Sequence, residues 1–321
     1  MTQDSAVRIA VLDDWQSVAS DVVDWTVLDS IGEVSFLHEF PADTATMVAR
    51  LKDFDVICVM RERTLFDEPL LSQLPKLKLL VSAGMRNAAL DLAATKRLGI
   101  QVAGTESYKH AAPELTWALI MAVTRNIVEE ANSLRAGNWQ VDIGSDLYGK
   151  TLGIVGLGSI GQRVARYALA FDMKVIAWSE NLTAERAAEH GVTYVSKAEL
   201  FEQSDIVSVN LVLSDRSRGL VDAQSLNRMK PTAYLINTAR GPIVDEDALV
   251  ELLKQKKIAG AALDVFAQEP LPADHPLRSL PNLLATPHVG YVTENNYRMF
   301  FTQMIEDIQA WHAGSPIRLF A

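Results

Sequence analysis

The sequence contains a single cysteine, Cys58, among its 321 residues. One cysteine excludes an intrachain disulfide and a cysteine-based zinc cluster, and we predict no metal site. The longest uncharged stretch near the middle, residues 115–124, is too short to cross a bilayer. The N-terminus, MTQDSAVRIAVLDDW, lacks the basic region and apolar run of a secretory signal. These absences predict a soluble, cytoplasmic protein with no membrane partner.

Basic residues are also scarce, because 30 Lys and Arg stand against 40 Asp and Glu and give a net charge of −10. This charge repels nucleic acid, so we expect no nucleic-acid partner. A small anionic substrate is compatible with it only in a locally basic pocket. Hydrophobic residues at 49% and charged residues at 22% exclude disorder, collagen and coiled coil as the main architecture. The length is comfortable for two domains.

Short apolar runs alternate with longer amphipathic runs along most of the chain. This alternation predicts an α/β fold with parallel sheets covered by helices on both faces. Strands are expected at residues 9–12, 56–60, 77–82, 152–155, 174–178, 206–209, 233–237 and 259–263. Helices are expected at residues 18–28, 90–98, 113–135, 160–171, 183–189, 245–254 and 294–311.

Two series of strands and helices are separated by the long helical stretch 113–135, and the second series begins at Lys150. The helical segment after Pro287 has no strand partner and can pack back onto the first series. We therefore predict a discontinuous first domain, residues 1–104 with 292–321, and a second domain, residues 105–291.

The strongest local motif is the Gly-rich turn GLGSIG, in which Gly156, Gly158 and Gly161 follow an apolar strand. Ser159 and Ile160 lie between the last two glycines and open an amphipathic helix. Glycines at this spacing allow a tight turn and a close approach of the backbone to a pyrophosphate at the helix N-terminus. The motif predicts a dinucleotide site, and an ordinary Gly-rich turn is the alternative.

The next strand ends at Ser179, where an acidic residue usually binds the adenosine ribose. Serine cannot bind a ribose diol through two oxygens. The following residue is Glu180, and no Arg or Lys occurs before Arg186 to receive a 2′-phosphate. A solvated loop and a direct ribose contact both remain open for Ser179. We predict NAD(H) or NADP(H) as cofactor, with a lean to NAD(H).

Three polar residues follow later expected strands: Arg240, Glu269 and His288. The carboxyl ends of strands line the ligand crevice of an open α/β sheet. Histidine can transfer a proton near neutral pH, a carboxylate beside it fixes its tautomer, and arginine gives a planar fork for carboxylate oxygens. Taken singly, each of the three also fits a solvent-exposed loop or turn residue.

Four ordered motifs decide between these interpretations: GLGSIG, NTARGPIVDEDAL, AALDVFAQEPLP and TPHVG. Together they resemble the D-isomer-specific 2-hydroxyacid dehydrogenase family, in particular glyoxylate/hydroxypyruvate reductases and phosphoglycerate dehydrogenases. The resemblance implies two flavodoxin/Rossmann-like domains with a deep cleft between them, the first for substrate and the second for a nicotinamide cofactor. It also implies a homodimer built by the cofactor domains.

The resemblance implies a role for each matching residue of the second domain. Arg240 would bind the substrate carboxylate and carbonyl, His288 would be the acid/base, and Glu269 would be its partner. Asp264 would bind the nicotinamide carboxamide. Thr238 and Gly290 would also lie in the cofactor site.

In the first domain, the loop SAGMR occupies the place where relatives hold the substrate carboxylate by backbone N–H groups, so Ala83, Gly84 and Arg86 are candidate substrate-binding residues. Many relatives have glycine where Arg86 stands, and a pocket and a solvent-facing role for Arg86 both remain open. The chain departs from the family pattern at Ser179, where NAD-specific relatives carry Asp. At Tyr291 a small residue is common.

The function that the sequence predicts is reversible reduction of a small 2-oxoacid, such as glyoxylate or hydroxypyruvate, to a D-2-hydroxyacid with NAD(P)H. Two alternatives are a non-catalytic, cofactor-sensing binding protein on the same fold and a formate- or phosphite-type dehydrogenase. Formate-type relatives place Gln where Glu269 stands, which argues against the latter.

Overall fold

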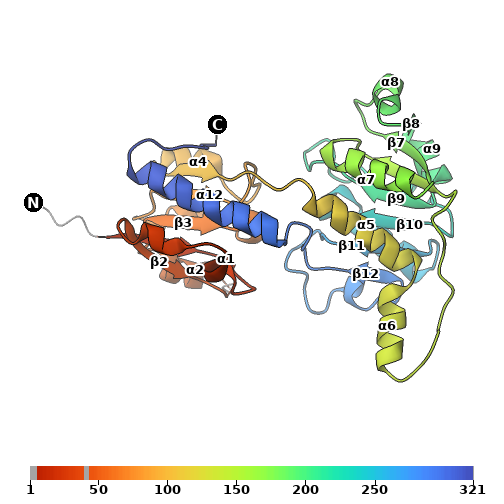
Figure 1. Ribbon diagram of the computed structural model, residues 1–321, viewed down its shortest axis with the longest axis horizontal. Coiled ribbons are helices and arrows are strands. Elements are labelled where there is room, and N and C mark those ends of the chain that lie inside the picture. Colours follow the sequence, from red (N-terminus) through yellow and green to blue (C-terminus); the bar gives the residue numbers. More distant parts are fainter. Residues whose placement is uncertain (1–5, 40–42, 321) are drawn as a thin grey trace, which may run out of the picture. The chain divides into compact units, whose positions relative to one another are not determined.

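The computed structural model describes residues 6–39 and 43–320. The first five residues, on which part of the signal-sequence prediction rests, lie outside this range. The chain divides into two compact units: unit 1 is Met1–Tyr108 with Val292–Ala321, and unit 2 is Lys109–Tyr291 (Figure 1). We expected the first crossing between the domains at residues 104/105. The functional labels of the two domains stay predictions.

Unit 1 is built on a five-stranded, fully parallel sheet in the order β2-β1-β3-β4-β5, which is the flavodoxin-like arrangement. Its strands are β1 (Val7–Val11), β2 (Gly32–Phe36), β3 (Val56–Val59), β4 (Leu79–Ser82) and β5 (Gln101–Gly104). Its helices are α1 (Ala19–Val22), α2 (Thr44–Leu51), α3 (Glu68–Leu71), α4 (Leu92–Arg97) and α12 (Glu294–His312), with 3-10 turns η1 (Trp25–Leu28) and η2 (Arg61–Arg63).

The C-terminal segment returns to unit 1, so this unit is discontinuous in sequence. Helix α12 packs against α1, β4 and β5. The last described residues then run beside β5, where the Phe320 amide donates to the Val102 carbonyl at 2.9 Å. The Gly104 amide donates to the Arg318 carbonyl at 3.0 Å.

Unit 2 contains a seven-stranded parallel sheet in the order β12-β11-β10-β9-β6-β7-β8. Its strands are β6 (Thr151–Val155), β7 (Lys174–Trp178), β8 (Thr193–Tyr194), β9 (Ile206–Val209), β10 (Tyr234–Asn237), β11 (Gly260–Leu263) and β12 (Leu283–Ala285). Its helices are α5 (Ala111–Thr124), α6 (Ile127–Arg135), α7 (Ser159–Ala170), α8 (Ala184–Ala188), α9 (Lys197–Gln203), α10 (Ala223–Leu226) and α11 (Glu246–Lys254), with η3 (Gly241–Ile243) and η4 (Pro276–Arg278).

The strand order of unit 2 reverses between β6 and β9. Read from the β8 edge, it is the 3-2-1-4-5-6 order of a dinucleotide-binding sheet, extended by a seventh strand. Ligands of open α/β sheets bind at this switch point, beyond the carboxyl ends of the strands. The Gly-rich turn follows β6 and therefore lies at the switch point.

Both faces of the unit 2 sheet are buried. Leu235 packs with the cluster that contains helices α9, α10 and α11, whereas its neighbour Ile236 packs with the cluster that contains α5 and α7. Successive strand residues point to opposite faces, so a strand with both faces buried is apolar throughout. This explains why the central strands are short apolar runs without polar alternation.

Two expected helices are wrong in their extent. The stretch 18–28 is a short helix, α1, and a 3-10 turn, η1, because Val23 between them has an extended backbone. The single helical stretch 113–135 is two helices, α5 and α6, because Asn126 between them adopts a left-handed backbone conformation with φ of 50°. The four strands that the apolar pattern missed, β2, β5, β8 and β12, are all at sheet edges. No helix within residues 6–39 and 43–320 is long and apolar enough to cross a membrane.

Candidate active site

The Gly-rich turn has the geometry of an anion cradle. Gly156 has φ of +98°, and a Cβ on it would lie 2.7 Å from the Leu211 side chain. A Cβ on Gly161 would lie 2.2 Å from the Gly156 carbonyl oxygen, so helix α7 approaches the turn more closely than any other residue type permits. A Cβ on Gly158 would meet no atom within 4 Å. The turn is therefore closely packed at Gly156 and Gly161 and open at Gly158.

The N-terminus of α7 supplies donors at this turn. The amides of Ser159 and Ile160 have no acceptor among the described residues, as expected for the first turn of a helix. Arg163 folds back from the next turn and donates to the Ser159 carbonyl and hydroxyl oxygens at 3.0 and 3.1 Å. Free N–H groups, the helix dipole and this cation all favour an anion here, so the residues fit a pyrophosphate.

Ser179 follows β7 and is partly exposed. Its carbonyl oxygen accepts from the Leu182 amide at 3.0 Å, which closes a turn after the strand. Arg186 of helix α8 reaches back to this turn, with Nη1 3.5 Å from the Asn181 carbonyl oxygen. The first cation after Ser179 in sequence therefore lies beside the loop that follows Ser179.

Arg240 begins the turn after β10, and this turn packs against the segment after β11. A Cβ on Gly241 would come within 1.9 Å of the Phe266 carbonyl carbon, so only glycine allows the two loops to approach this closely. The Phe266 amide in turn donates to Oε1 of Glu269 at 2.9 Å. Arg240 is half-buried, and its Nη1 donates to the Ala239 carbonyl oxygen at 2.7 Å.

Glu269 and His288 are in direct contact. Nδ1 of His288 lies 2.6 Å from Oε2 of Glu269, although 19 residues separate the two. A carboxylate can only accept, so Nδ1 carries the proton and Nε2 is left for another partner. The two oxygens of Glu269 thus hold the Phe266 backbone and the His288 ring at once. Of the three predicted chemical residues, these two are joined by a hydrogen bond.

Asp264 holds the loop on both sides of His288. Its carboxylate accepts from the Thr286 hydroxyl at 2.6 Å, the Val289 amide at 2.9 Å and the Gly290 amide at 2.8 Å. Asp264 is 1% exposed, and this burial raises the pKa of its carboxyl although the three hydrogen bonds oppose the shift. His288 itself has φ of 52°, a conformation that a non-glycine residue keeps only when its surroundings hold it. A contact of Asp264 with a nicotinamide carboxamide stays a prediction.

Thr238 also follows β10, and a residue that the sequence analysis did not select fixes its hydroxyl. Thr116 of helix α5 is fully buried, and its hydroxyl lies 2.6 Å from the Thr238 hydroxyl. Thr116 also donates to the Ala112 carbonyl, so it accepts from Thr238 and aligns it.

The candidate substrate loop of unit 1 follows β4. Gly84 has φ of +92°, and its amide donates to the Thr105 hydroxyl at 2.9 Å. The Ala83 amide donates to the Val59 carbonyl at 2.9 Å. These two amides are used within unit 1, whereas those of Met85 and Arg86 have no acceptor among the described residues. Any carboxylate held by backbone N–H groups of this loop would therefore be held by the latter two.

A cation that lies far from the loop in sequence covers Gly84. A Cβ on Gly84 would be 2.8 Å from Nη1 of Arg61, and the same nitrogen lies 3.4 Å from the Ser107 hydroxyl. Arg86, in contrast, is exposed. Of the two arginines, Arg61 places its charge against the loop. The sequence feature that points to Arg61 is its position just after the carboxyl end of β3.

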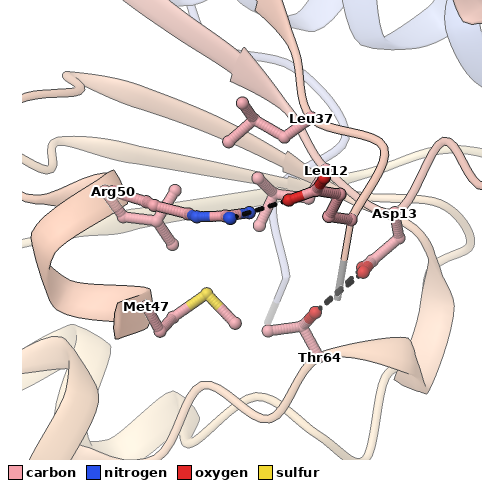
Figure 2. A pocket seen from close by; sticks show the side chains of 8 residues that line it. Leu12, Asp13, Leu37, Met47, Arg50 and Thr64 are labelled. Atoms are coloured by element: carbon pink, nitrogen blue, oxygen red, sulfur yellow. Dashed lines mark hydrogen bonds and ion pairs between the residues drawn. The ribbon is translucent and has the colours of Figure 1, made fainter. Parts of the chain in front are cut away.

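A cavity of about 10 Å³ in unit 1 is lined by none of the predicted site residues (Figure 2). It lies where β1, β2 and α2 meet η2 and has room for about one water molecule. Its lining residues are Leu12, Asp13, Leu37, Glu39, Met47, Arg50, Leu51 and Thr64. Asp13, at its wall, accepts from the Thr64 hydroxyl at 3.0 Å. The cavity is too small for a substrate.

Comparison with known proteins identifies the family. Residues 117–290 match the model of the D-isomer specific 2-hydroxyacid dehydrogenase NAD binding domain. The chain is 37% identical over 284 residues to a glyoxylate reductase of Aeropyrum pernix, covering 85% of this chain and 84% of the relative. The chain belongs to the D-isomer specific 2-hydroxyacid dehydrogenase family. It is therefore an oxidoreductase of the 2-hydroxyacid dehydrogenase type, and it binds NAD(P)(H).

Other family members and solved structures agree. A D-3-phosphoglycerate dehydrogenase of Synechocystis is 35% identical over 305 residues, which are 94% of this chain but only 55% of that longer protein. The crystal structure of a phosphoglycerate oxidoreductase from Vibrio cholerae has a TM-score of 0.92 at 36% identity, covering 96% of this chain and 99% of that one. An acyclic imino acid reductase bound to NADPH and D-Arg has a TM-score of 0.77 at 27% identity, covering 98% and 100%.

The structure of the Asp13 site predicts a pH dependence of stability. Burial raises the pKa of Asp13 from 3.8 to about 6 in the folded chain. The folded state therefore binds this proton more tightly than the unfolded state. Below about pH 4 Asp13 is protonated in both states and does not lower the free energy of unfolding. Between about pH 4 and pH 6 its ionisation lowers the free energy of unfolding progressively. The full decrease is about 3 kcal/mol.

We therefore expect the free energy of unfolding of Asp13→Asn, measured with urea, to increase relative to that of wild type by about 3 kcal/mol between pH 4 and pH 7. The difference between variant and wild type removes the contribution of all other carboxylates. A difference that stays constant across this range would mean that Asp13 ionises normally.

Proposed function

We propose that the protein reduces a small 2-oxoacid to a D-2-hydroxyacid with NAD(P)H, and that the reaction is reversible. The observation that supports this most is the 2.6 Å contact between His288 and Glu269 in the loops that follow β12 and β11. These loops belong to the sheet whose switch point has the Gly-rich turn. The proposed proton donor and the Gly-rich turn therefore both follow strands of one sheet at its carboxyl edge, where ligands of such sheets bind.

In this proposal each group has one task. His288, as the imidazolium with a proton on each nitrogen, passes the Nε2 proton to the carbonyl oxygen. The Glu269 carboxylate accepts from Nδ1–H, which orients the ring and offsets its positive charge. Arg240 offers a planar fork to the substrate carboxylate and carbonyl. When bound, the reduced nicotinamide supplies the hydride that adds to C2. In the reverse direction His288 takes the hydroxyl proton.

The substrate is anionic in this proposal. In unit 1, the Met85 and Arg86 amides would hold its carboxylate, while Ala83 and Gly84 shape the loop. The guanidinium of Arg61 supports this, because it lies against Gly84 and brings a cationic donor to the loop while its Nε pairs with Glu62 at 3.7 Å. Candidates are glyoxylate, hydroxypyruvate and 3-phosphohydroxypyruvate. The similar proteins include a glyoxylate reductase, a glycerate dehydrogenase and a phosphoglycerate oxidoreductase.

We further propose that two chains associate through unit 2. None of the residues of helix α6 is buried, and this helix presents Ile127, Val128 and Leu134 to solvent. The loop that follows leaves Trp139 75% and Ile143 93% exposed. Exposed apolar side chains gathered on one helix and its following loop are typical of an interface.

The direct test of the proposed function is a panel of glyoxylate, hydroxypyruvate and 3-phosphohydroxypyruvate with NADH. We expect turnover of at least one, with D-glycerate formed from hydroxypyruvate if it is used. His288→Asn should lower kcat by ~10²–10⁴, the usual contribution of a general acid, with cofactor Kd nearly unchanged. The exposed His190, changed to Asn, is the matched control.

Two outcomes would contradict the proposal. Cofactor binding without turnover of any 2-oxoacid would favour a cofactor-sensing protein. A His288→Asn variant that retains more than about a tenth of the wild-type kcat would remove His288 from the proton transfer.

Cofactor choice is predicted to be weak, with NADH favoured by less than about tenfold in kcat/KM. Ser179 lacks the carboxylate that would repel a 2′-phosphate, and Arg186 beside Asn181 offers it a cation, while Glu180 opposes it. Arg186→Ala should therefore lower kcat/KM for NADPH more than for NADH. Arg166→Ala, at an exposed position of α7, is the control. A wild-type preference for NADPH above about a hundredfold would overturn the lean to NADH.

A further inference from the structure

The aromatic ring of Tyr291 lies against the imidazole of His288. The two ring centroids are 5.5 Å apart and the planes cross at 81°, an edge-to-face arrangement. Tyr291 is 8% exposed, so its ring is fixed within the protein. Neither the Glu269 contact nor the Gly-rich turn explains why an aromatic residue stands here.

The loop geometry makes this contact a consequence of the His288 turn. The amides of Val289 and Gly290 both donate to Asp264, so the chain after His288 cannot swing away. A Cβ on Gly290 would lie 3.0 Å from the Asp264 carboxylate, which allows no larger residue without a shift. With His288 in a left-handed conformation, the clamped chain brings the third residue after it back onto the ring.

Glu269 alone leaves one motion of the imidazole free. A single hydrogen bond to Nδ1 fixes the position of that nitrogen, but the ring can still rock about the line through the contact. The side-chain torsion that sets the plane of a histidine ring is broad, so it does not fix the plane by itself. A ring packed edge-to-face against the imidazole opposes this rocking and covers one side of it against water.

We propose that Tyr291 is a positioning residue of the acid–base pair, whose ring holds the plane of His288 so that Nε2 points to the substrate carbonyl. The proposal rests on the proposed function, because it takes His288 as the proton donor. Tyr291 does not exchange a proton with the substrate. The aromatic ring, rather than the hydroxyl group, performs the role.

The experiment compares Tyr291→Ala, Tyr291→Leu and Tyr291→Phe. We expect Ala and Leu to lower kcat by about 10- to 100-fold, as expected when a reacting group loses its alignment, with KM for the 2-oxoacid and Kd for the cofactor changed less than about threefold. Phe should retain at least about half of kcat. Leu keeps apolar bulk, so it remains informative if Ala unfolds. Tyr167→Ala, which removes a T-shaped contact with Trp117 elsewhere in unit 2, is the control.

A spectroscopic readout tests the ring contact without turnover. In protein with ¹³C-labelled histidine, the ring-proton resonances of His288, assigned with His288→Asn, should be shifted by the ring current of Tyr291. The shift should persist in Tyr291→Phe and disappear in Tyr291→Leu. If wild type turns over no 2-oxoacid, the proposed function fails, and these resonances still decide whether the ring contact exists.

Four results would overturn the proposal. They are an Ala or Leu variant with more than about half of the wild-type kcat, a loss confined to KM, a Phe variant as impaired as Leu, and His288 resonances that do not respond to removal of the ring. A loss of the same size in Tyr167→Ala would show a general packing defect and would count against it equally.

Discussion

The loop that contains His288, the proposed proton donor, depends on one buried carboxylate. Asp264 sits directly after β11 and accepts three hydrogen bonds from the segment between Thr286 and Gly290. A carboxylate that is 1% exposed remains in place only because each bond to it is made, since an unsatisfied buried charge costs several kcal/mol. The strained backbone of His288 is held between these bonds. Glu269 and Tyr291 can then act on the His288 ring from defined positions.

A second feature of the protein is that its positive charge is local. The chain has a net charge of −10, yet Arg163 lies at the N-terminus of α7, Arg61 lies against Gly84, and Arg240 begins the turn after β10. Each of these arginines is near a predicted anion contact. A net negative charge repels large polyanions, whereas a small anion can still bind beside a single arginine. This agrees with a metabolic substrate of low molecular weight.

The sequence predicted the features that depend on local pattern. Alternating apolar runs gave the α/β class, and glycine spacing at 156, 158 and 161 gave the turn that the structure builds after β6. The edge strands β2, β5, β8 and β12 were missed because they have only two to five residues. Strands β2, β8 and β12 also bury at most one residue each, so little apolar pattern marks them. The break at Asn126 was missed although asparagine is a poor helix former and adopts the left-handed conformation more readily than most residues. The three hydrogen bonds of Asp264 and the ring contact of Tyr291 depend on how distant loops fold together, and no spacing encodes that.

The clamp by Asp264 is the central claim, and hydrogen exchange tests it most directly. In wild type the amide hydrogens of Val289 and Gly290 should be protected, because both donate to Asp264. In the Asp264→Asn variant one of the two carboxylate oxygens becomes an NH2 group, which cannot accept. At least one of the two amides should therefore exchange at least about tenfold faster, since a lost hydrogen bond to a charged group is worth about 1.5–3 kcal/mol. The exposed Asp274, changed to Asn, should leave these rates unchanged. Equal rates in wild type and Asp264→Asn would contradict the account.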